Sequence, residues 1–432
     1  MFGFSTMLSR KVLFTLGAVT LLGLTGCQAT KSNIAQTGPL MVGPGAQTAL
    51  GKVEKDYTYN SDIYLDIAVP VFNPGLPLND RGEVDYEEVD EQQIWPQLRR
   101  AEAKRFAIQT KKALENTGAF GSVSVVPSPN TSADVFVLGS VDLSDSEFVK
   151  VTATVVDSTG DIWGNRQFEH QVSKGFFRDA QNKDKNPYEP IFKEIGDYVF
   201  DLLVKQNEQE KASIKETTKV RYAQLYSPET YGKYIEQKLV KGRSGIQDHY
   251  RFNLVGAPSE NDRMLSRIEV LKTQDQMFVD GLQEQYLAFD AETVESYRTW
   301  QRETLPEAVA AREAKSERLK SGILAGVFAV GAVLLNKNSG STAGAVGKTV
   351  GALASAYFIK DTLDKNAELK VHKESLDEIG EKLDINLSPS VMEFDNKTVE
   401  LTGTAGEQYE QWKSHLRKIY EVESAQAQDN KL

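Results

Sequence analysis

The sequence predicts an α+β fold, and three observations lead to this prediction. Residues 57–208 alternate short runs of β-branched residues with two amphipathic helical patterns, in the order β-α-β-β-β-β-α. Residues 209–320 are rich in Glu, Lys, Gln and Arg, a composition typical of long exposed helices. A glycine-rich apolar stretch at 321–360 favours a helical hairpin, and residues 361–422 favour a small helix-hairpin-helix unit.

The first of these regions is expected to be one α/β domain that opens with a strand at residues 63–69, which Pro70 ends. An acidic loop at 83–91 leads to a helix over residues 94–116. The apolar residues of this helix recur at 3.6-residue spacing, which indicates one buried face. Gly118 then ends the helix, because glycine adopts a positive φ without strain.

Four further strands are expected at residues 120–126, 135–141, 148–156 and 162–172. Valine and alanine alternate with polar residues along the third of them, and this period of two is typical of a strand with one buried face. The turn at 157–160 joins the last two strands as a hairpin, with Gly160 free to take a positive φ. A closing helix carries an apolar stripe from Ile191 to Leu203.

Three segments of this domain stand out: the opening IYLDIAVPVFNPG, the passage ALENTGAFGSVSVV and the hairpin VTATVVDSTGDIWGNRQFEH. Together they resemble the periplasmic lipoprotein domains of the curli-secretion-channel and TolB amino-terminal type. The resemblance is one of topology and is confined to residues 57–208. Because the chain after residue 208 does not continue it, the resemblance does not carry over a channel.

Large apolar side chains in the charged region 209–320 indicate a core, with a partner-binding face as the alternative. They are Tyr286, Leu287, Phe289, Val294, Tyr297 and Trp300. In the last region, a helix at 363–383 is expected to precede two short strands joined by a turn at 395–397. Four apolar residues of these strands would share one sheet face: Met392, Phe394, Val399 and Leu401.

The run TVELTGTAGEQYEQWKSHLRKI resembles the BON module of envelope proteins, which has been linked to phospholipid surfaces. This sequence departs from the module in lacking its final strand. Residues 423–432 are expected to be a disordered tail.

The first thirty residues have the three parts of a secretory signal. Arg10 and Lys11 supply the positive charge, residues 12–24 are apolar, and small residues lead to Cys27. The alternative is an uncleaved membrane anchor, but the apolar core is short for a membrane span.

The tetrad Leu24-Thr25-Gly26-Cys27 resembles the lipobox of bacterial lipoproteins. The resemblance implies removal of residues 1–26 and attachment of fatty acyl chains, palmitate among them, to Cys27. Because residue 28 is Gln and not Asp, it also implies delivery to the outer membrane. More than one acyl chain anchors a protein stably, and residues 27–56 are expected to be a flexible tether to a mainly periplasmic protein.

Composition excludes several classes of function. The formal net charge is −11, and removal of Arg10 and Lys11 with the signal makes the remainder more negative, which argues against nucleic acid as a partner. Cys27 is the only cysteine, so a lipidated Cys27 leaves no thiol for a disulfide, for thiolate catalysis or for a zinc cluster.

A second motif imitates a nucleotide site. Gly347-Lys348-Thr349 fits the end of the P-loop pattern G-x-x-x-x-G-K-[ST], but the first glycine would have to be residue 342, which is Thr342. Since an exported lipoprotein also has no ATP supply in the periplasm, we expect no nucleotide to bind.

The same stretch is better explained as an apolar helical hairpin. Its first arm, residues 322–335, has no charge, and its second arm, residues 343–359, is interrupted only by Lys348. Small residues, mostly at four-residue spacing, would allow close helix contact. The candidates for membrane insertion or self-association are Gly322, Gly326, Gly331, Gly344, Gly347, Gly351 and Ser355.

The sequence is compatible with three locations for this hairpin. It is buried within the helical region, lies in or on the membrane, or self-associates to build an oligomer such as a pore. The first arm spans roughly 21 Å at 1.5 Å per residue, which is short of a hydrocarbon core of about 30 Å.

Catalytic and metal patterns are weak. The four histidines are His170, His249, His372 and His415. None lies in H-E-x-x-H, no G-x-S-x-G motif occurs, and the acidic loop 83–91 lacks the alternation and glycine of a calcium loop. We therefore expect no metal and no cofactor.

These observations favour a non-enzymatic outer-membrane lipoprotein that acts in envelope assembly, export or maintenance through contacts with other envelope proteins. The alternative is an oligomeric, membrane-inserting secretion or pore component that uses the 321–360 hairpin. An enzymatic function, most plausibly as a hydrolase, is a third possibility without a motif to support it.

Overall fold

The computed structural model describes residues 55–92, 94–242, 246–259, 261–333 and 367–429. These residues belong to one compact unit, Pro44–Leu432. Cys27, the P-loop-like motif and the second arm of the expected hairpin lie outside the described residues.

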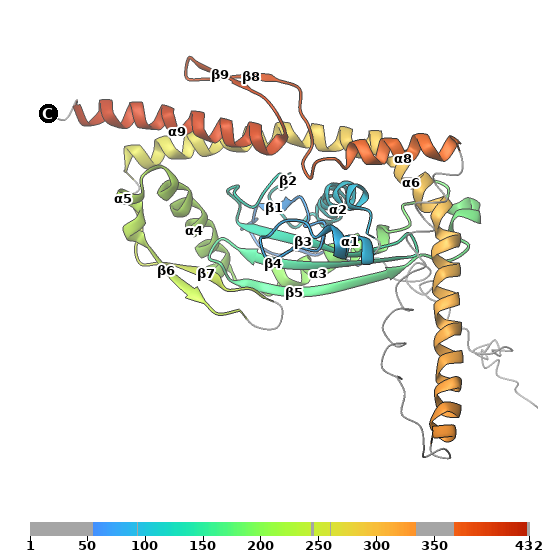
Figure 1. Cartoon of the computed structure of the whole chain (residues 1–432). Coiled ribbons are helices and arrows are strands. Elements are labelled where there is room, and N and C mark those ends of the chain that lie inside the picture. Colours follow the sequence, from blue (N-terminus) through green and yellow to red (C-terminus); the bar gives the residue numbers. More distant parts are fainter. Residues whose placement is uncertain (1–54, 93, 243–245, 260, 334–366, 430–432) are drawn as a thin grey trace, which may run out of the picture. The chain divides into compact units, whose positions relative to one another are not determined.

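A five-stranded mixed sheet forms the centre of the first part of the chain (Figure 1). Its strands are β1 (Ile67–Pro70), β2 (Val123–Val126), β3 (Val135–Ser144), β4 (Phe148–Asp157) and β5 (Ile162–Gln171). The strand order is β2-β1-β3-β4-β5; β1 is parallel to both of its neighbours, whereas β3, β4 and β5 are antiparallel.

Helices α2 (Pro96–Glu115) and α3 (Glu189–Leu203) pack on one face of this sheet. Their aromatic side chains meet over the strands, with the rings of Phe106 and Phe192 5.1 Å apart. Gly118 has a φ of 62°, as expected of a residue that ends a helix in the left-handed region. The predicted order β-α-β-β-β-β-α is confirmed except for one additional short helix before α2.

The opposite face of β4 and β5 is polar. Thr152 and Gln167 both donate to Asp142, at 2.6 and 2.8 Å, and Asn165 donates to Thr154. The alternation predicted for β4 is confirmed, because every second residue of this strand is buried, on the face that α3 covers.

The expected acidic loop at 83–91 is in part a helix, and the prediction is wrong there. Short helix α1 (Tyr86–Glu91) begins after Asp85, whose carboxylate accepts from the backbone N–H groups of Glu87 and Glu88. An aspartate cap with acidic residues in the first turn stabilises even a short helix, because both compensate the unpaired N–H groups there.

The middle region is only partly helical. It contains α4 (Glu208–Tyr226), α5 (Pro228–Tyr231) and α6 (Arg263–Val333), but also a hairpin of β6 (Ile235–Val240) and β7 (His249–Leu254). Cross-strand pairs Gln237↔Phe252 and Leu239↔Tyr250 lie on one face of this hairpin. The sequence analysis missed these strands because charged residues separate their few apolar ones.

Pro306 does not end α6. A proline inside a helix costs about 3 kcal/mol, yet its neighbours Leu305, Ala308 and Val309 are buried. Burial of this helix face offsets the lost backbone hydrogen bond. Of the expected core residues, Tyr286, Tyr297 and Trp300 are buried, whereas Leu287 and Val294 are exposed.

The last region contains α8 (Ala367–Ile379), β8 (Ser390–Phe394), β9 (Lys397–Leu401) and α9 (Ala405–Asp429). The predicted shared face of the hairpin is confirmed by the pair Met392↔Val399 and by the exposure of Val391 on the other face. Helix α9 continues to Asp429, beyond the point where the tail was expected to begin.

Arg267 of α6 stabilises the last turns of α9. It forms ion pairs with Glu423 of α9 at 2.5 Å and with Asp395, in the turn between β8 and β9, at 2.7 Å.

This last region packs on the first, because α8 contacts α2 and α6 contacts both β2 and α9. Gly380, just after α8, shows how closely the two parts meet, since a Cβ there would lie 1.9 Å from the carbonyl oxygen of Gln97. Described residues of the first, middle and last regions, such as Val137, Trp300 and Trp412, therefore belong to one buried core. Within the described residues, we find no helix that is both long and apolar enough to cross a membrane.

The edge of the sheet formed by β2 is covered by a side chain of α6. Gln283 of α6 donates to the carbonyl oxygen of Val125 and accepts from its backbone N–H, both at 2.9 Å. The amide thus occupies the place of a neighbouring strand on β2. Pairing of this kind removes an edge that would otherwise be open to other chains.

Replacing Gln283 with alanine is expected to lower the free energy of unfolding by about 1–3 kcal/mol, because two backbone groups of β2 lose their partner. Urea unfolding followed by circular dichroism measures this loss. The control is Gln276→Ala, a half-buried position on the same helix whose amide donates to Asp280. Equal losses for the two variants would contradict the role assigned to Gln283.

Candidate functional site

A row of buried charged side chains lies in the middle of α2 and faces α3, α6 and α8. Arg99, Glu102, Lys104 and Arg105 are each 5 % exposed or less. Charged residues are rarely buried so completely unless they are paired. Their partners come from elements far along the chain.

Glu102 is the centre of a network that joins four elements. Its carboxylate accepts from the hydroxyls of Ser144, at 2.5 Å, and of Tyr297, at 2.8 Å. The hydroxyl of Tyr188, the residue before α3, is hydrogen-bonded to the same serine hydroxyl. Burial raises the pKa of Glu102, although the nearby Arg99 and the two hydroxyls oppose the change.

Lys104 of α2 caps the C-terminus of helix α8. Its amine donates to the carbonyl oxygens of Ile379, at 2.6 Å, and of Lys382, at 3.0 Å, and lies over the ring of Phe289. A cation at a helix C-terminus compensates the unpaired carbonyls there. Burial lowers the pKa of Lys104 to about 8.

Asp290 of α6 binds three side chains of α2. Arg105 lies 3.1 Å from its carboxylate, Lys112 lies 2.6 Å away, and Gln109 donates to it at 3.0 Å. Arg105 also donates to Thr293 and stacks over the ring of Tyr297. This cluster fixes the position of α6 on α2.

A pocket of about 220 Å³ lies beside this cluster, between α2, α6 and the loop that precedes α3. Its wall consists of Arg105, Gln109, Lys112, Asp184, Asn186, Pro187, Asp290, Val294, Tyr297, Arg298 and Gln301. It is the strongest candidate for a binding site among the described residues, because the buried Arg105 and Asp290 both line it.

A second hollow, of about 400 Å³, lies between β9 and α9. Its wall is formed mainly by half-exposed or exposed polar side chains such as Glu400, Gln411 and Lys418. It contains no fully buried charge, and its histidine, His415, stacks on Trp412 as part of the α9 packing. We regard it as a surface groove.

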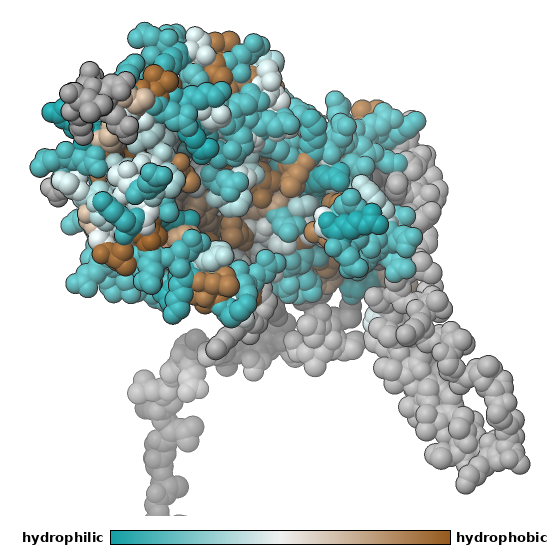
Figure 2. Space-filling view, turned by 60° about the vertical axis from the view of Figure 1, so that its left-hand side comes forward, coloured by the Kyte–Doolittle hydropathy of each residue, from teal (hydrophilic) through white to brown (hydrophobic). Residues whose placement is uncertain are grey.

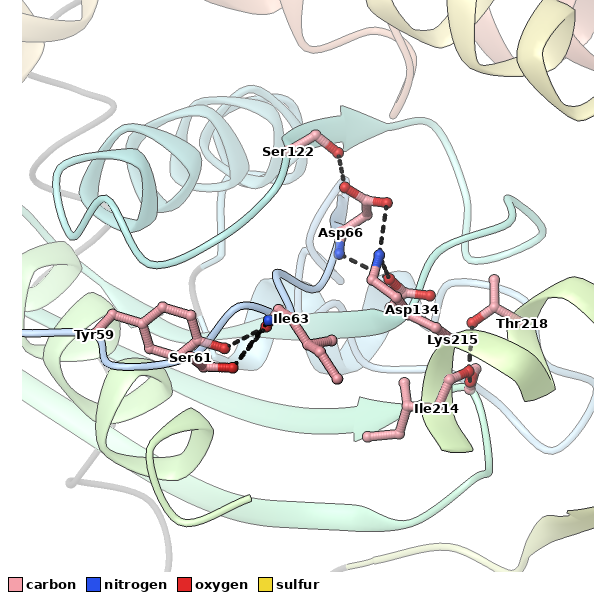
Figure 3. A network of polar contacts seen from close by, with 10 residues as sticks. Tyr59, Ser61, Ile63, Asp66, Ser122, Asp134, Ile214, Lys215 and Thr218 are labelled. Carbon is pink, nitrogen blue, oxygen red and sulfur yellow. Dashed lines mark hydrogen bonds and ion pairs between the residues drawn. The ribbon is translucent and has the colours of Figure 1, made fainter. Parts of the chain in front are cut away.

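A pair of carboxylates lies near the start of β1 (Figure 3). Asp66 accepts from Ser122 at 2.8 Å, Asp134 accepts from the backbone N–H of Asp66 at 3.0 Å, and Lys215 lies 3.2 Å from Asp134. Since every carboxylate here is compensated by a donor from the fold, the arrangement fastens α4 to the sheet and leaves no free acid or base.

The four histidines do not come together. His170 lies on β5, His249 on β7, His372 on α8 and His415 on α9. Burial lowers the pKa of His170 and of His415. Across the part of the chain that the structure describes, no group of three or more histidine, cysteine, aspartate or glutamate side chains could hold a metal ion.

The small residues of the expected hairpin are placed only in part. Gly322, Gly326 and Gly331 belong to α6, whose helical backbone continues to Val333. The remaining candidates, Gly344, Gly347, Gly351 and Ser355, lie outside the described residues, as does Cys27.

The sequence analysis missed the buried row on α2. The signal was present in LRRAEAKRFAI, where charged residues stand on all sides of a helix that must nevertheless bury a face against the sheet.

The visible surface offers no single large apolar patch. Figure 2 shows hydrophobic residues in small separate groups on a mainly hydrophilic face. Exposed single apolar residues of this kind are normal for a folded protein and indicate no site by themselves.

No family model, no curated protein and no solved structure matches this chain.

Proposed function

We propose that this chain is a non-enzymatic lipoprotein of the outer membrane that acts in envelope assembly, export or maintenance through protein–protein contacts. The lipobox-like tetrad ending at Cys27 supports the anchor, and the acidic charge supports a partner other than nucleic acid. The folded unit that follows is a scaffold, in which long helices are fastened to an α/β sheet.

One observation carries this proposal: α6 is continuous from the packed core into the glycine-rich stretch. Near the core, Arg312 binds the buried Glu147 at 2.9 Å, and Glu313 pairs with Lys174. Beyond Glu313 the helix continues to Val333, a length of roughly 30 Å at 1.5 Å per residue. The fold therefore presents the start of the 321–360 segment at the end of a helix that it holds firmly.

A second candidate is an oligomeric, membrane-inserting secretion or pore component. The observation that favours it is the placement of Gly322 and Gly326 one helical turn apart on α6. Small residues at this spacing permit close contact between helices. In this case the segment after Val333 would be a second membrane element or the contact between copies.

Replacing Cys27 with alanine, behind a cleavable signal that lacks a lipobox, is expected to release the protein from membranes in a carbonate wash. The physical reason is that acyl chains would be its only stable membrane anchor. Wild-type protein is the control and should remain with the membranes and incorporate labelled palmitate.

Retention of the variant by washed membranes would instead support the second candidate, and its size in detergent would then separate a monomer from a ring. Absence of palmitate from the wild-type protein would refute the lipoprotein proposal itself.

A further inference from the structure

We propose that the pocket between α2, α6 and the loop before α3 binds a small organic acid through its carboxylate group. The proposal does not depend on the lipid anchor or on the partner of the protein. It follows from an amide without a partner, an excess of positive charge, and an apolar wall, all in one pocket.

The amide belongs to Gln301. This side chain is 1 % exposed and lines the pocket, and its Nε2 atom has no hydrogen-bond partner among the described residues. A buried donor without a partner costs about 1–3 kcal/mol. A ligand oxygen in the pocket would satisfy it.

The charges of the wall favour a single negative charge on the ligand. Three cations line the pocket, Arg105, Lys112 and Arg298, against two carboxylates, Asp184 and Asp290. The excess of one positive charge matches a monocarboxylate. A phosphate or a dicarboxylate would bring a second charge against Asp290, which already lies at the wall.

Arg105 supplies the geometry that a carboxylate needs. Its contacts with Asp290 and Thr293 use Nη1, so neither Nε nor Nη2 is required for them. A guanidinium presents five N–H donors in a planar fork that suits carboxylate oxygens. Stacking over Tyr297, with 4.8 Å between the guanidinium carbon and the ring centre, holds the fork in place.

The rest of the pocket would accommodate a short carbon chain. Pro187 and Val294 contribute apolar surface to its wall. The volume of about 220 Å³ is smaller than the pockets that hold drug-sized ligands, which are about 300–1,000 Å³. A short-chain carboxylic acid has the size and the chemistry that these walls select.

The test compares acids with their uncharged isosteres. Thermal unfolding of the full chain in detergent is measured with acetate, propionate, butyrate and hexanoate, and with the amide of each. At least one acid is expected to raise the unfolding temperature while its amide does not, because a ligand that binds only the folded state stabilises it. If no acid does so, or if each amide acts as well as its acid, the pocket holds only water and the proposal is wrong.

Two variants then locate the site. Gln301→Met and Lys112→Gln are each expected to weaken binding of the best acid by about tenfold or more, as expected for loss of a hydrogen bond or a charge at the carboxylate. Gln301→Met should not destabilise the unliganded protein, because the amide it removes has no partner to lose.

The matched control is Lys111→Gln, which removes the neighbouring cation of α2. Lys111 pairs with Glu115 and is not part of the pocket wall. Wild-type affinity in either test variant, or equal loss in the control, would overturn the proposal.

Discussion

Replacing Asp290 with alanine is expected to lower the free energy of unfolding by about 3–5 kcal/mol, the loss typical of breaking a buried ion pair. The variant leaves Arg105, a cation that is 4 % exposed, without its carboxylate partner. It also removes the acceptor of Lys112 and of Gln109. Because all three donors belong to α2, the loss falls on the contact that holds α6 to the sheet.

Urea unfolding followed by tryptophan fluorescence measures this effect, since Trp300 lies on α6 near the same contact and is buried. Asp280→Ala is the matched control, an exposed acid on the same helix whose carboxylate accepts from the side chain of Gln276. Its expected loss is below about 0.5 kcal/mol. A loss of similar size for Asp290→Ala would show that the buried charges of α2 do not fix α6.

The sheet could be predicted because its strands carry the pattern of their surroundings. Strand β4 lies between a buried and a polar face, so valine and alanine alternate with lysine and threonine along it. Hairpin β6–β7 could not be predicted in this way, since only a few of its residues, Phe252 among them, pack on the body of the protein. A strand with few buried residues shows little alternation of apolar and polar residues in its sequence.

The course of α6 shows a different limit. Pro306 indicates a helix end from local geometry alone, and the helix continues because Leu305 and Val309 are buried by residues elsewhere in the chain. Tertiary packing of this kind cannot be seen in a local window. The same holds for the end of α9, which Arg267 stabilises from a distance of more than a hundred residues.

The candidate site was beyond prediction for the same reason. Arg105 and Gln301 line one pocket, yet they lie on α2 and α6, two helices that are far apart in the sequence. Strands β2 to β5 come between them along the chain. Neither belongs to a motif with a fixed spacing. The sequence does show charged residues in the middle of α2. The structure shows that these side chains are paired with residues elsewhere in the fold.

Replacing Glu102 with glutamine is expected to change how stability depends on pH. Burial raises the pKa of Glu102 above its ordinary value of 4.5. As the pH rises above that value, the unfolded chain loses the proton first, and the folded protein binds more protons than the unfolded one. The unfolding free energy of the wild-type protein therefore falls with rising pH through this site.

Glutamine cannot ionise, so the variant lacks this contribution, while all other titrating groups are common to the two proteins and cancel in their difference. Relative to the wild type, Glu102→Gln should gain stability from about pH 4.5 upward, by about 1.4 kcal/mol for each unit by which the pKa is raised. Urea unfolding at a series of pH values gives the difference. A difference that is independent of pH would contradict the raised pKa.

A third protein separates charge from hydrogen bonding at the same position. Glu102→Ala removes the acceptor of Ser144 and of Tyr297 as well as the charge, and should be less stable than Glu102→Gln by about 1–3 kcal/mol, because two buried hydroxyls lose their partner. Its difference from Glu102→Gln should not vary with pH, because neither side chain titrates. If Glu102→Ala were as stable as Glu102→Gln, the hydroxyls of Ser144 and Tyr297 would have other acceptors, and the network would not join α2 to α6.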